Sequence, residues 1–310
     1  MATSLTRKGL ICASDKVILA ARPAMELVRQ FVLDASPKPG DKGATVRIPV
    51  MAATAKDFNE TSQNYVTSTN SIKYADVVLS GDKISAYTLN DLDALEDDLA
   101  PVWGQLAPTA GRAIGKAFVE AVMGVLTYDK ADAQKTVATA TFADFVKIRA
   151  AVSGAGYDPA DTVLLLEPNA YNTLVSLLPA SVVGEGGVVN SALIGARLGF
   201  KAVLEAPHAS KTSGAKPTSG NAPEKGVGFA VPANALIVAN RYKAPILGAV
   251  GNLVEAGQST DEETGLVIGT RVVVDQAAGV AAWSAEALFG VALAKQNGNG
   301  APGFVQLVTA

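Results

Sequence analysis

The side chains that most often carry catalysis or bind metals are scarce in this chain, which has one histidine and one cysteine among its 310 residues. A serine–histidine–aspartate triad would depend on His208, which lies in the Ser-, Thr-, Gly- and Lys-rich segment Pro207–Lys225, and a G-x-S-x-G motif is absent. A lone cysteine can form neither an intrachain disulfide nor a cysteine-based zinc site, so Cys12 is expected to be a small buried residue.

One acidic cluster is dense enough to be considered for chemistry. Five carboxylates lie between Asp91 and Asp98 with no basic residue among them. Paired carboxylates can bind a divalent metal or transfer protons. The spacing is not that of a calcium loop and no histidine stands nearby. We therefore favour a structural interpretation, in which these acids stabilise the start of a helix because negative charge complements the helix dipole.

A glycine-rich segment near the end of the chain, Gly298–Gly303, fits the pattern G-x-G-x-x-G of dinucleotide-binding loops. That fingerprint needs a strand before it and a helix after it. Here Pro302 interrupts the pattern and the chain ends at Ala310, so we interpret the segment as a loop. A G-x-x-x-x-G-K-[ST] motif is also absent. The sequence thus predicts no catalytic residue, no metal site and no cofactor, and we do not expect an enzyme.

The composition is that of a folded chain. Hydrophobic residues make up 49% and charged residues 18%, and the formal net charge is −3. The high hydrophobic content excludes a disordered chain. The small negative charge provides neither an overall positive field for binding nucleic acid nor a polybasic membrane-binding signal. The longest apolar stretch, Ala277–Ala294, contains Ser284 and Glu286 and is too broken to span a bilayer. One large domain or two interleaved lobes are expected.

The first ninety residues predict a basic arm, a short helix and a long hairpin. The helix begins at Arg22-Pro23 and places Met25, Val28, Phe31 and Val32 on one face. Alternating apolar residues predict a strand over Ala44–Val50, and Pro49 suits an edge position. Pairing resumes over Ile72–Leu79, followed by a turn at Ser80–Lys83 and a strand over Ile84–Leu89. Met51–Ser71 forms the polar tip.

A long helix is predicted over Val102–Leu126. Its apolar stripe recurs every four residues, at Leu106, Ala110, Ile114, Phe118, Val122 and Leu126. Pro108 lies inside it and is expected to kink or split the helix. Gly111 and Gly115 lie one turn apart and weaken the helix, so we predict that another backbone packs closely against them.

The remainder reads as a mixed lobe followed by antiparallel strands. Helices are expected over Phe142–Ser153 and from Pro168 to Pro179. Strands are expected at Thr162–Leu166, Ala202–Leu204, Gly228–Val231, Ala235–Val238, Gly251–Ala256, Leu266–Val274 and Val280–Leu293.

The order of these segments, together with four local sequences, resembles the major capsid protein of tailed bacteriophages, which has the Hong Kong 97-type fold. The sequence ISAYTLNDLD from Ile84 is similar to the exit of that family's extended loop into its long spine helix. The sequence EPNAYNTL from Glu167 is similar to the strand-to-helix step of its axial domain. ETGLVIGTR from Glu263 and ALFGVA from Ala287 resemble the final strands of many phage coat proteins.

The resemblance implies an α+β fold of the Hong Kong 97-like capsid type. It divides the chain into an N-terminal arm (1–40), an extended β-hairpin loop (41–89), a peripheral domain with the spine helix (90–130 and 245–297), a mixed α/β axial domain (131–244) and a C-terminal tail (298–310). No scaffolding segment precedes the arm and no maturation protease site is recognisable, so we expect an uncleaved chain with any scaffolding supplied by a separate protein.

The function implied by the resemblance is that of a major capsid protein, which assembles into an icosahedral shell around the phage genome. Its partners would be other copies in pentamers and hexamers, scaffolding, portal and decoration proteins, and packaged DNA contacted without sequence specificity, with no membrane contact. It would be located in the virion and assembled in the host cytoplasm. The residues expected at contacts between subunits are Arg7, Lys8, Arg47, Lys56, Asp57, Glu60 and Lys73.

Two alternatives stay open at this point. An encapsulin-like cellular cage for cargo enzymes would share the fold, and DNA inside purified particles would distinguish the two. An α/β hydrolase or lyase using carboxylates and lysines would instead be a compact monomer or small oligomer.

Overall fold

The structure is a computed structural model and describes residues 7–35, 43–50, 72–90, 99–127, 130–137, 142–178, 191–206, 226–241, 253–261, 263–275, 280–296 and 301–308. Its helices are α1 (Arg7–Arg29), α3 (Leu99–Val125), α4 (Phe142–Gly154), the 3₁₀ turn η2 (Pro159–Asp161), α5 (Pro168–Leu177) and α7 (Ser191–Leu198). Its first strands are β1 (Val32–Asp34), β2 (Thr45–Val50), β3 (Lys73–Val78), β4 (Gly81–Asn90), β5 (Ala133–Thr136), β6 (Thr162–Leu166) and β7 (Ala202–Glu205). The others are β8 (Gly226–Pro232), β9 (Leu236–Arg241), β10 (Leu253–Thr260), β11 (Val267–Asp275), β12 (Val280–Leu293) and β13 (Val305–Val308).

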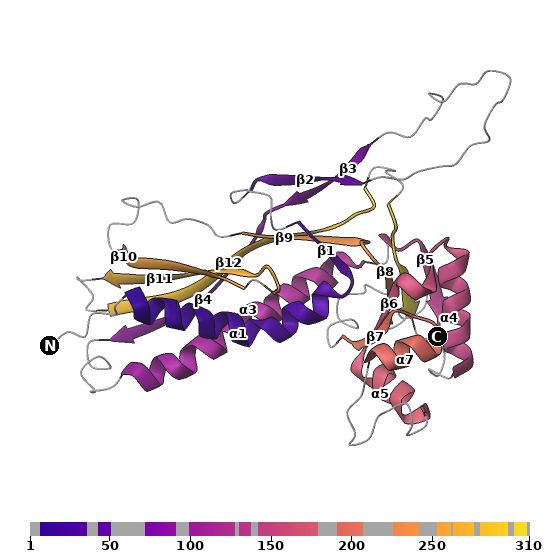
Figure 1. Cartoon of the computed structure of the whole chain (residues 1–310), viewed down its shortest axis with the longest axis horizontal. Helices are drawn as coiled ribbons and strands as arrows, with labels where there is room; N and C mark the ends of the chain where they lie inside the picture. The colour runs from indigo at the N-terminus through magenta and orange to yellow at the C-terminus, as the bar shows by residue number, and fades with distance from the viewer. Residues whose placement is uncertain are drawn as a thin grey trace, which may run out of the picture.

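The strands form two sheets and a separate hairpin. A six-stranded sheet has the order β1-β9-β12-β11-β10, with β4 paired to the first part of β12, and a five-stranded sheet has the order β5-β13-β8-β6-β7. Strands β2 and β3 form a two-stranded antiparallel sheet. In Figure 1, α1 and α3 run side by side along one face of the six-stranded sheet, β2–β3 lies on its other side, and α4, α5 and α7 surround the five-stranded sheet.

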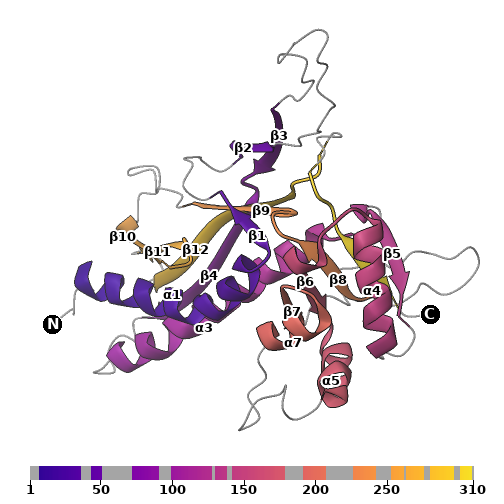
Figure 2. The same ribbon diagram turned by 45° about the vertical axis from the view of Figure 1, so that its right-hand side comes forward.

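The helix layer on the six-stranded sheet depends on two glycines of α3. A Cβ at Gly111 would lie 2.2 Å from the backbone oxygen of Val17 in α1, and one at Gly115 would lie 3.1 Å from the Cβ of Ala24. The absent side chains let the two helix backbones meet, which confirms the close approach predicted at these positions. Both views show α1 and α3 in contact along most of their length (Figures 1 and 2).

The hairpin β2–β3 covers the opposite face of the same sheet. Its inward residues, among them Val46, Ile48 and Val77, are buried against Ile237 of β9 and Leu288 of β12. The two layers approach so closely that a Cβ at Gly290 would lie 2.3 Å from the backbone oxygen of Val78. Strand β12 is therefore covered on both faces, by the helices and by the hairpin.

Much of the predicted secondary structure is confirmed. The apolar stripe of the long helix is buried at Ala110, Ile114, Phe118, Val122 and Leu126. The strand predicted over Ala44–Val50 pairs with the one predicted over Ile72–Leu79. The elements confirmed after residue 140 are α4, β6, α5, β7, β8, β9, β10, β11 and β12.

Three predictions for the first half of the chain were wrong. Helix α1 begins at Arg7 rather than Arg22, because Val17, Ile18 and Ala21 extend its buried face toward the N-terminus. The helix continues through Pro23 because a proline removes only one backbone N–H donor and this proline is exposed. Val32 belongs to β1, where it pairs with Leu236.

The long helix is continuous through Pro108 and does not split there, while a kink at this proline stays a prediction. The third error, after the start of α1 and the placement of Val32, concerns the turn at Ser80–Lys83. Strand β4 does not fold back on β3, because it pairs with the longer strand β12 instead. The pairing of β4 with β12 runs from Gly81 opposite Phe289 to Asn90 opposite Val280. Elements missed by the sequence analysis are β1, β5, α7 and β13.

The division into domains stays a prediction, but strand pairing places three segments differently from the predicted boundaries. Strand β4, assigned to the extended loop, and β9, assigned to the axial domain, both pair with β12. Strand β13, in the supposed C-terminal tail, is buried between β5 and β8 in the five-stranded sheet. Strands β9 and β13 are apolar and buried, and each finds its cover by joining a sheet whose other strands are remote in sequence.

A buried carboxylate fastens α1 to the turn between β10 and β11. Asp261 is 5% exposed and accepts hydrogen bonds from Arg22 Nη2 at 2.9 Å and from Thr264 Oγ1 at 2.7 Å. Burial alone would raise the pKa of Asp261, but the hydrogen bonds from Thr264 and Arg22 outweigh it and hold that pKa below its usual value. Arg22 also contacts the exposed carboxylate of Glu263 at 2.8 Å.

Gly111→Ala should destabilise the fold by about 1–3 kcal/mol, because the added methyl meets the backbone of α1 rather than a movable side chain. The matched control is Gly124→Ala on the same helix, where a Cβ would have no neighbour within 4 Å. That variant should be stabilised, by about 1 kcal/mol from helix propensity. Chemical or thermal unfolding of the two variants measures the difference, and equal stabilities would refute the close-packing role.

Asp261→Asn should lower the free energy of unfolding at neutral pH by about 2 kcal/mol, since it removes the charge that Arg22 and Thr264 stabilise. Because the folded-state pKa of Asp261 is lowered, its contribution is present above about pH 4 and is lost as the pH falls through the folded-state pKa. The stabilities of parent and variant should therefore converge in acid. Glu263→Gln, at the exposed partner, is the control and should have little effect.

Candidate assembly surface

The outward face of the β2–β3 hairpin carries large side chains of the kinds that anchor protein interfaces. Cross-strand pairing sets Arg47 opposite Asp76, and Pro49 opposite Tyr74. Tyr74 is 49% exposed and Val78 is 47% exposed. The Arg47 guanidinium lies 5.7 Å from the centre of the Tyr74 ring, a cation–π distance. We call the exposed set Arg47, Tyr74, Asp76 and Val78 the hairpin face.

The strand β3, which carries most of the hairpin face, is bound to the six-stranded sheet on its inner side. Gln296, which follows β12, accepts a hydrogen bond from the backbone N–H of Asp76 and donates one to its carbonyl oxygen, both at 3.0 Å. The same side chain donates to the carbonyl oxygen of Leu293 at 2.8 Å. Together with the buried inner residues, this ties β3 to the six-stranded sheet. A partner would therefore meet a surface that is already ordered, which lowers the entropy lost on binding.

The ion pair on the hairpin face contributes little to folding. Arg47 Nε lies 2.9 Å from Asp76 Oδ1, yet the two side chains are 64% and 42% exposed. The hydrogen bond to Asp76 raises the pKa of the Arg47 guanidinium, so this group stays cationic. Exposed ion pairs are screened by water and salt. The pair thus fixes the orientation of Arg47 over Tyr74, and it leaves a charged, amphipathic patch facing solvent.

Of the predicted contact residues, the structure brings two to this region. Arg47 is at the centre of the hairpin face, and Lys73 opens β3, where it is exposed. Arg7 and Lys8 lie far from it, in the first turn of α1, and only their backbone is described. Lys56, Asp57 and Glu60 fall outside the described residues, as do His208 and the acidic cluster Asp91–Asp98.

Tyr74, Asp76 and Val78 were not singled out from the sequence. The signal was present, because a strand over Ile72–Leu79 places alternate residues on one face. What the sequence did not show is that Ala75, Val77 and Leu79 take the inner side, since Val78 is as apolar as its neighbours. The pairing register between β3 and β2 determines which residues of β3 face inward.

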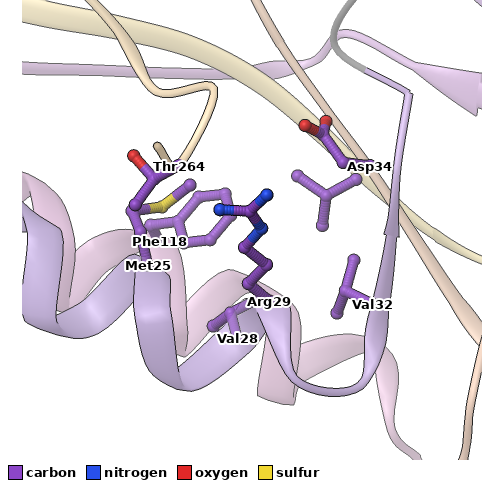
Figure 3. A pocket seen from close by; sticks show the side chains of 8 residues that line it. Met25, Val28, Arg29, Val32, Asp34, Phe118 and Thr264 are labelled. Atoms are coloured by element: carbon purple, nitrogen blue, oxygen red, sulfur yellow. The ribbon is translucent and has the colours of Figure 1, made fainter. Parts of the chain in front are cut away.

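A small pocket lies where α1 turns into β1 (Figure 3). Met25, Val28 and Phe118 supply apolar walls, and the Arg29 side chain rises between the Phe118 ring and the strand that carries Val32 and Asp34. The accessible space is about that of one water molecule. We interpret this pocket as imperfect packing at a chain reversal rather than as a ligand site.

A polar junction joins the two sheets. The Asp132 carboxylate accepts hydrogen bonds from the Tyr157 hydroxyl and from the Lys295 ammonium group, and the N–H of Gly303 donates to the Tyr157 hydroxyl at 2.9 Å. Burial, with the bond to Asp132, raises the pKa of Tyr157 to about 12. A Cβ at Gly303 would overlap the Asp132 carboxylate. The arrangement is satisfied within the chain and is structural.

Within the described part of the chain, no group of three or more His, Cys, Asp or Glu side chains is arranged to hold a metal ion. Among the same residues, no helix is both long and apolar enough to cross a membrane.

The fold is similar to that of solved phage structures. The cyanophage P-SCSP1u capsid structure aligns over 91% of this chain and 86% of that chain, with a TM-score of 0.51 and 11% sequence identity. A structure from Microbacterium phage Oxtober96 aligns over 92% and 90%, with a TM-score of 0.52 and 14% identity. The asymmetric unit of the mature bacteriophage PhiM1 capsid aligns over 89% and 85%, with a TM-score of 0.46 and 10% identity.

Sequence comparison gives no such relation: no family model and no curated protein sequence matches the chain. At identities this low, likeness to a solved structure concerns the fold. The capsid-type α+β fold predicted from the sequence is thereby confirmed over about nine-tenths of the chain.

Proposed function

We propose that this chain is the major capsid protein of a tailed bacteriophage and has a structural rather than an enzymatic role. The observation that carries the proposal is the extent of the fold likeness, which covers 91% of this chain and 86% of a cyanophage capsid chain. A shared domain alone would leave much of one chain unmatched. The absence of a catalytic triad or phosphate-binding loop from the sequence supports the same conclusion.

The chain would act by forming many weak contacts that repeat in a closed, symmetric assembly. We propose that the hairpin face is one of these contacts. It is ordered, exposed, centred on a tyrosine and an arginine, and only marginally involved in folding. Tyrosine and arginine are enriched where single side chains dominate binding energy. Lys73, Lys56, Asp57 and Glu60 are proposed contacts of the same extended loop, and Arg7 and Lys8 of the N-terminal region.

In this proposal, copies of the chain form pentamers and hexamers of an icosahedral shell, and the shell belongs to the virion. The five-stranded sheet with α4, α5 and α7 serves as the axial domain, and α3 serves as the spine helix. Scaffolding, portal and decoration proteins are the further partners expected of such a shell. Assembly takes place in the host cytoplasm, and the packaged DNA is contacted without sequence specificity.

The purified chain should form closed particles of many subunits, because each subunit offers several small interfaces whose energies add only in a complete shell. Negative-stain electron microscopy and light scattering measure this directly. DNA in particles isolated from the producing cell would favour a virus over a cellular cage. A chain that stays monomeric to tetrameric under all conditions that preserve virions would contradict the proposal.

The double variant Tyr74→Ser, Val78→Ser should fold normally and assemble poorly. Both side chains are about half exposed in the isolated chain, so their removal takes little from the core. If a neighbour buries them, at least a tenfold loss in the yield of closed particles is expected from their apolar area. The control is Leu19→Ser, which removes a side chain 59% exposed on α1, on the other side of the sheet. Circular dichroism and particle counts separate folding from assembly; equal yields for both variants would exclude the hairpin face as a contact.

A further inference from the structure

Strand β4 is the longest strand at a sheet margin in the described part of the chain. It pairs with β12 along one side, and no described strand pairs with its other side. In Figures 1 and 2, β4 borders the end of the six-stranded sheet whose opposite border is β10. The pairing with β12 is continuous from Gly81 to Asn90. A regular edge of this length presents a row of backbone donors and acceptors that a further strand can use.

The other strands at sheet margins have features that hinder such pairing. Strand β10 has an irregular register near its start and packs against α1, where Ser259 donates a hydrogen bond to Asp15 at 2.6 Å. Gln296 binds both the backbone N–H and the carbonyl oxygen of Asp76 in β3. Strand β2 contains Pro49, which has no N–H to donate. Strands β1, β5 and β7 have only three or four residues.

Strand β4 has little protection of this kind. Its only charged residues, Asp82 and Lys83, lie at its start, and residues 84–89 are uncharged and contain no proline. An uncharged edge of this length left in water favours uncontrolled pairing with other chains. Coverage of the edge by a specific partner in the native assembly would prevent it.

The two faces of β4 differ in burial. On the helix side, Tyr87 stacks on Trp283 with the ring centres 6.1 Å apart and packs against the core. The alternate residues Ile84, Ala86 and Thr88 are exposed on the other side, and Ile84 is 58% exposed. Contacts on the helix side therefore hold the strand in place, so a partner would meet an edge that is already ordered.

We infer that β4 pairs antiparallel with β4 of a second copy of the chain, about a two-fold axis perpendicular to the sheet. The inference rests on the proposed function and deepens it by naming one contact between subunits. Charge favours the antiparallel arrangement. A parallel pair in register would set each Lys83 beside its copy, and like charges that face each other destabilise strand pairing. An antiparallel pair sets the charged start of each strand against the uncharged second half of the other.

The register follows from the faces and the length of the strand. A two-fold axis perpendicular to the sheet keeps the exposed side chains of both copies on one side, so residues opposite each other are an even number of positions apart. An axis at Ser85 or at Ala86 meets this condition and overlaps almost the whole strand. Ile84 then lies opposite Ala86 or Thr88 of the second copy, and no charged residue meets another.

This pairing suits a closed shell, because the two-fold axes of an icosahedral shell are perpendicular to its surface. The same patch serves both copies, as a two-fold interface requires. The six-stranded sheets of the two subunits would join into one sheet lying along the shell. The helix layers of both copies would lie on one surface of that sheet, and their hairpins on the other.

Single cysteines in a Cys12→Ala background can locate the axis. Under mild oxidation, either Ser85→Cys or Ala86→Cys should give a disulfide-linked dimer, because residues opposite each other at the axis have Cα atoms about 5 Å apart, within disulfide range. Thr88→Cys is the matched control on the same strand. Its two copies would be at least about 13 Å apart along the strands, so it should not cross-link.

The outcomes distinguish this inference from the proposed function. A dimer absent from both intact particles and the concentrated soluble chain would overturn the inference, and particles that form without it would leave the proposed function in place. Cross-linking only between two different variants in a mixture would indicate a heterologous partner and would also overturn the two-fold pairing. Failure of the Cys12→Ala parent to form particles would count against the proposed function, whereas a specific dimer in solution would still support the pairing of β4.

A charge placed near the axis tests the same contact. Added to the cross-linking variant, Ile84→Lys should lower the yield of the dimer about tenfold, because the two new charges would lie close together across the edge. The control is Gln258→Lys, which adds the same charge at an exposed residue of β10, on the opposite margin of the sheet. Circular dichroism should show that both variants fold. Equal dimer yields would overturn the inference.

Discussion

The structure depends on the burial of β12 on both faces. This strand of 14 residues pairs with β4 along one edge and, along the other, first with β11 and then with β9. Trp283, Ala287 and Phe289 face the helix layer, and Leu288 faces the hairpin. A strand covered on both sides must be apolar throughout, and its neighbours must come close, which explains Gly290 under the hairpin. The one carboxylate buried in the strand, Glu286, is paired with Arg271 of β11, as a buried charge requires.

The hairpin shows how folding and assembly can use different sides of one element. Its inner residues join the core of the six-stranded sheet, and Gln296 fixes its backbone. An isolated two-stranded hairpin is marginal in water, so this attachment is what orders the outer residues. Arg47, Tyr74 and Val78 then stay about half exposed or more. A solvated polar face would fold equally well, and this is the reason for proposing the hairpin face as a contact between subunits.

The sequence predicted most of the elements but only part of how they pair. Continuous apolar runs located β6 and β12, which are buried on both faces, and a period-four stripe located α3, which buries one face. The patterns failed where the partner lies far away in the chain. The four residues of β13 fall in the predicted C-terminal tail, because no signal in the neighbouring sequence shows that β5 and β8 leave room for a strand between them. For the candidate surface, Arg47 was found by its charge, whereas Tyr74 and Val78 required the register between β2 and β3.

The two sheets share one continuous core, and this has a consequence for a shell subunit. Phe304 and Phe229 of the five-stranded sheet pack in the same cluster as Phe118 of α3 and Phe289 of β12. At the edge of this core, Asp132 binds both Tyr157 and Lys295 across the junction. Rotation of one sheet against the other would open apolar contacts, at a cost of about 1–3 kcal/mol for each large side chain that loses its packing, and would break the two hydrogen bonds of Asp132. Rearranging an interface between exposed polar side chains costs less free energy than that.

In a shell of the proposed kind, the structural differences between pentamers and hexamers would therefore be accommodated at surfaces such as the hairpin face, while the core of the subunit keeps its shape.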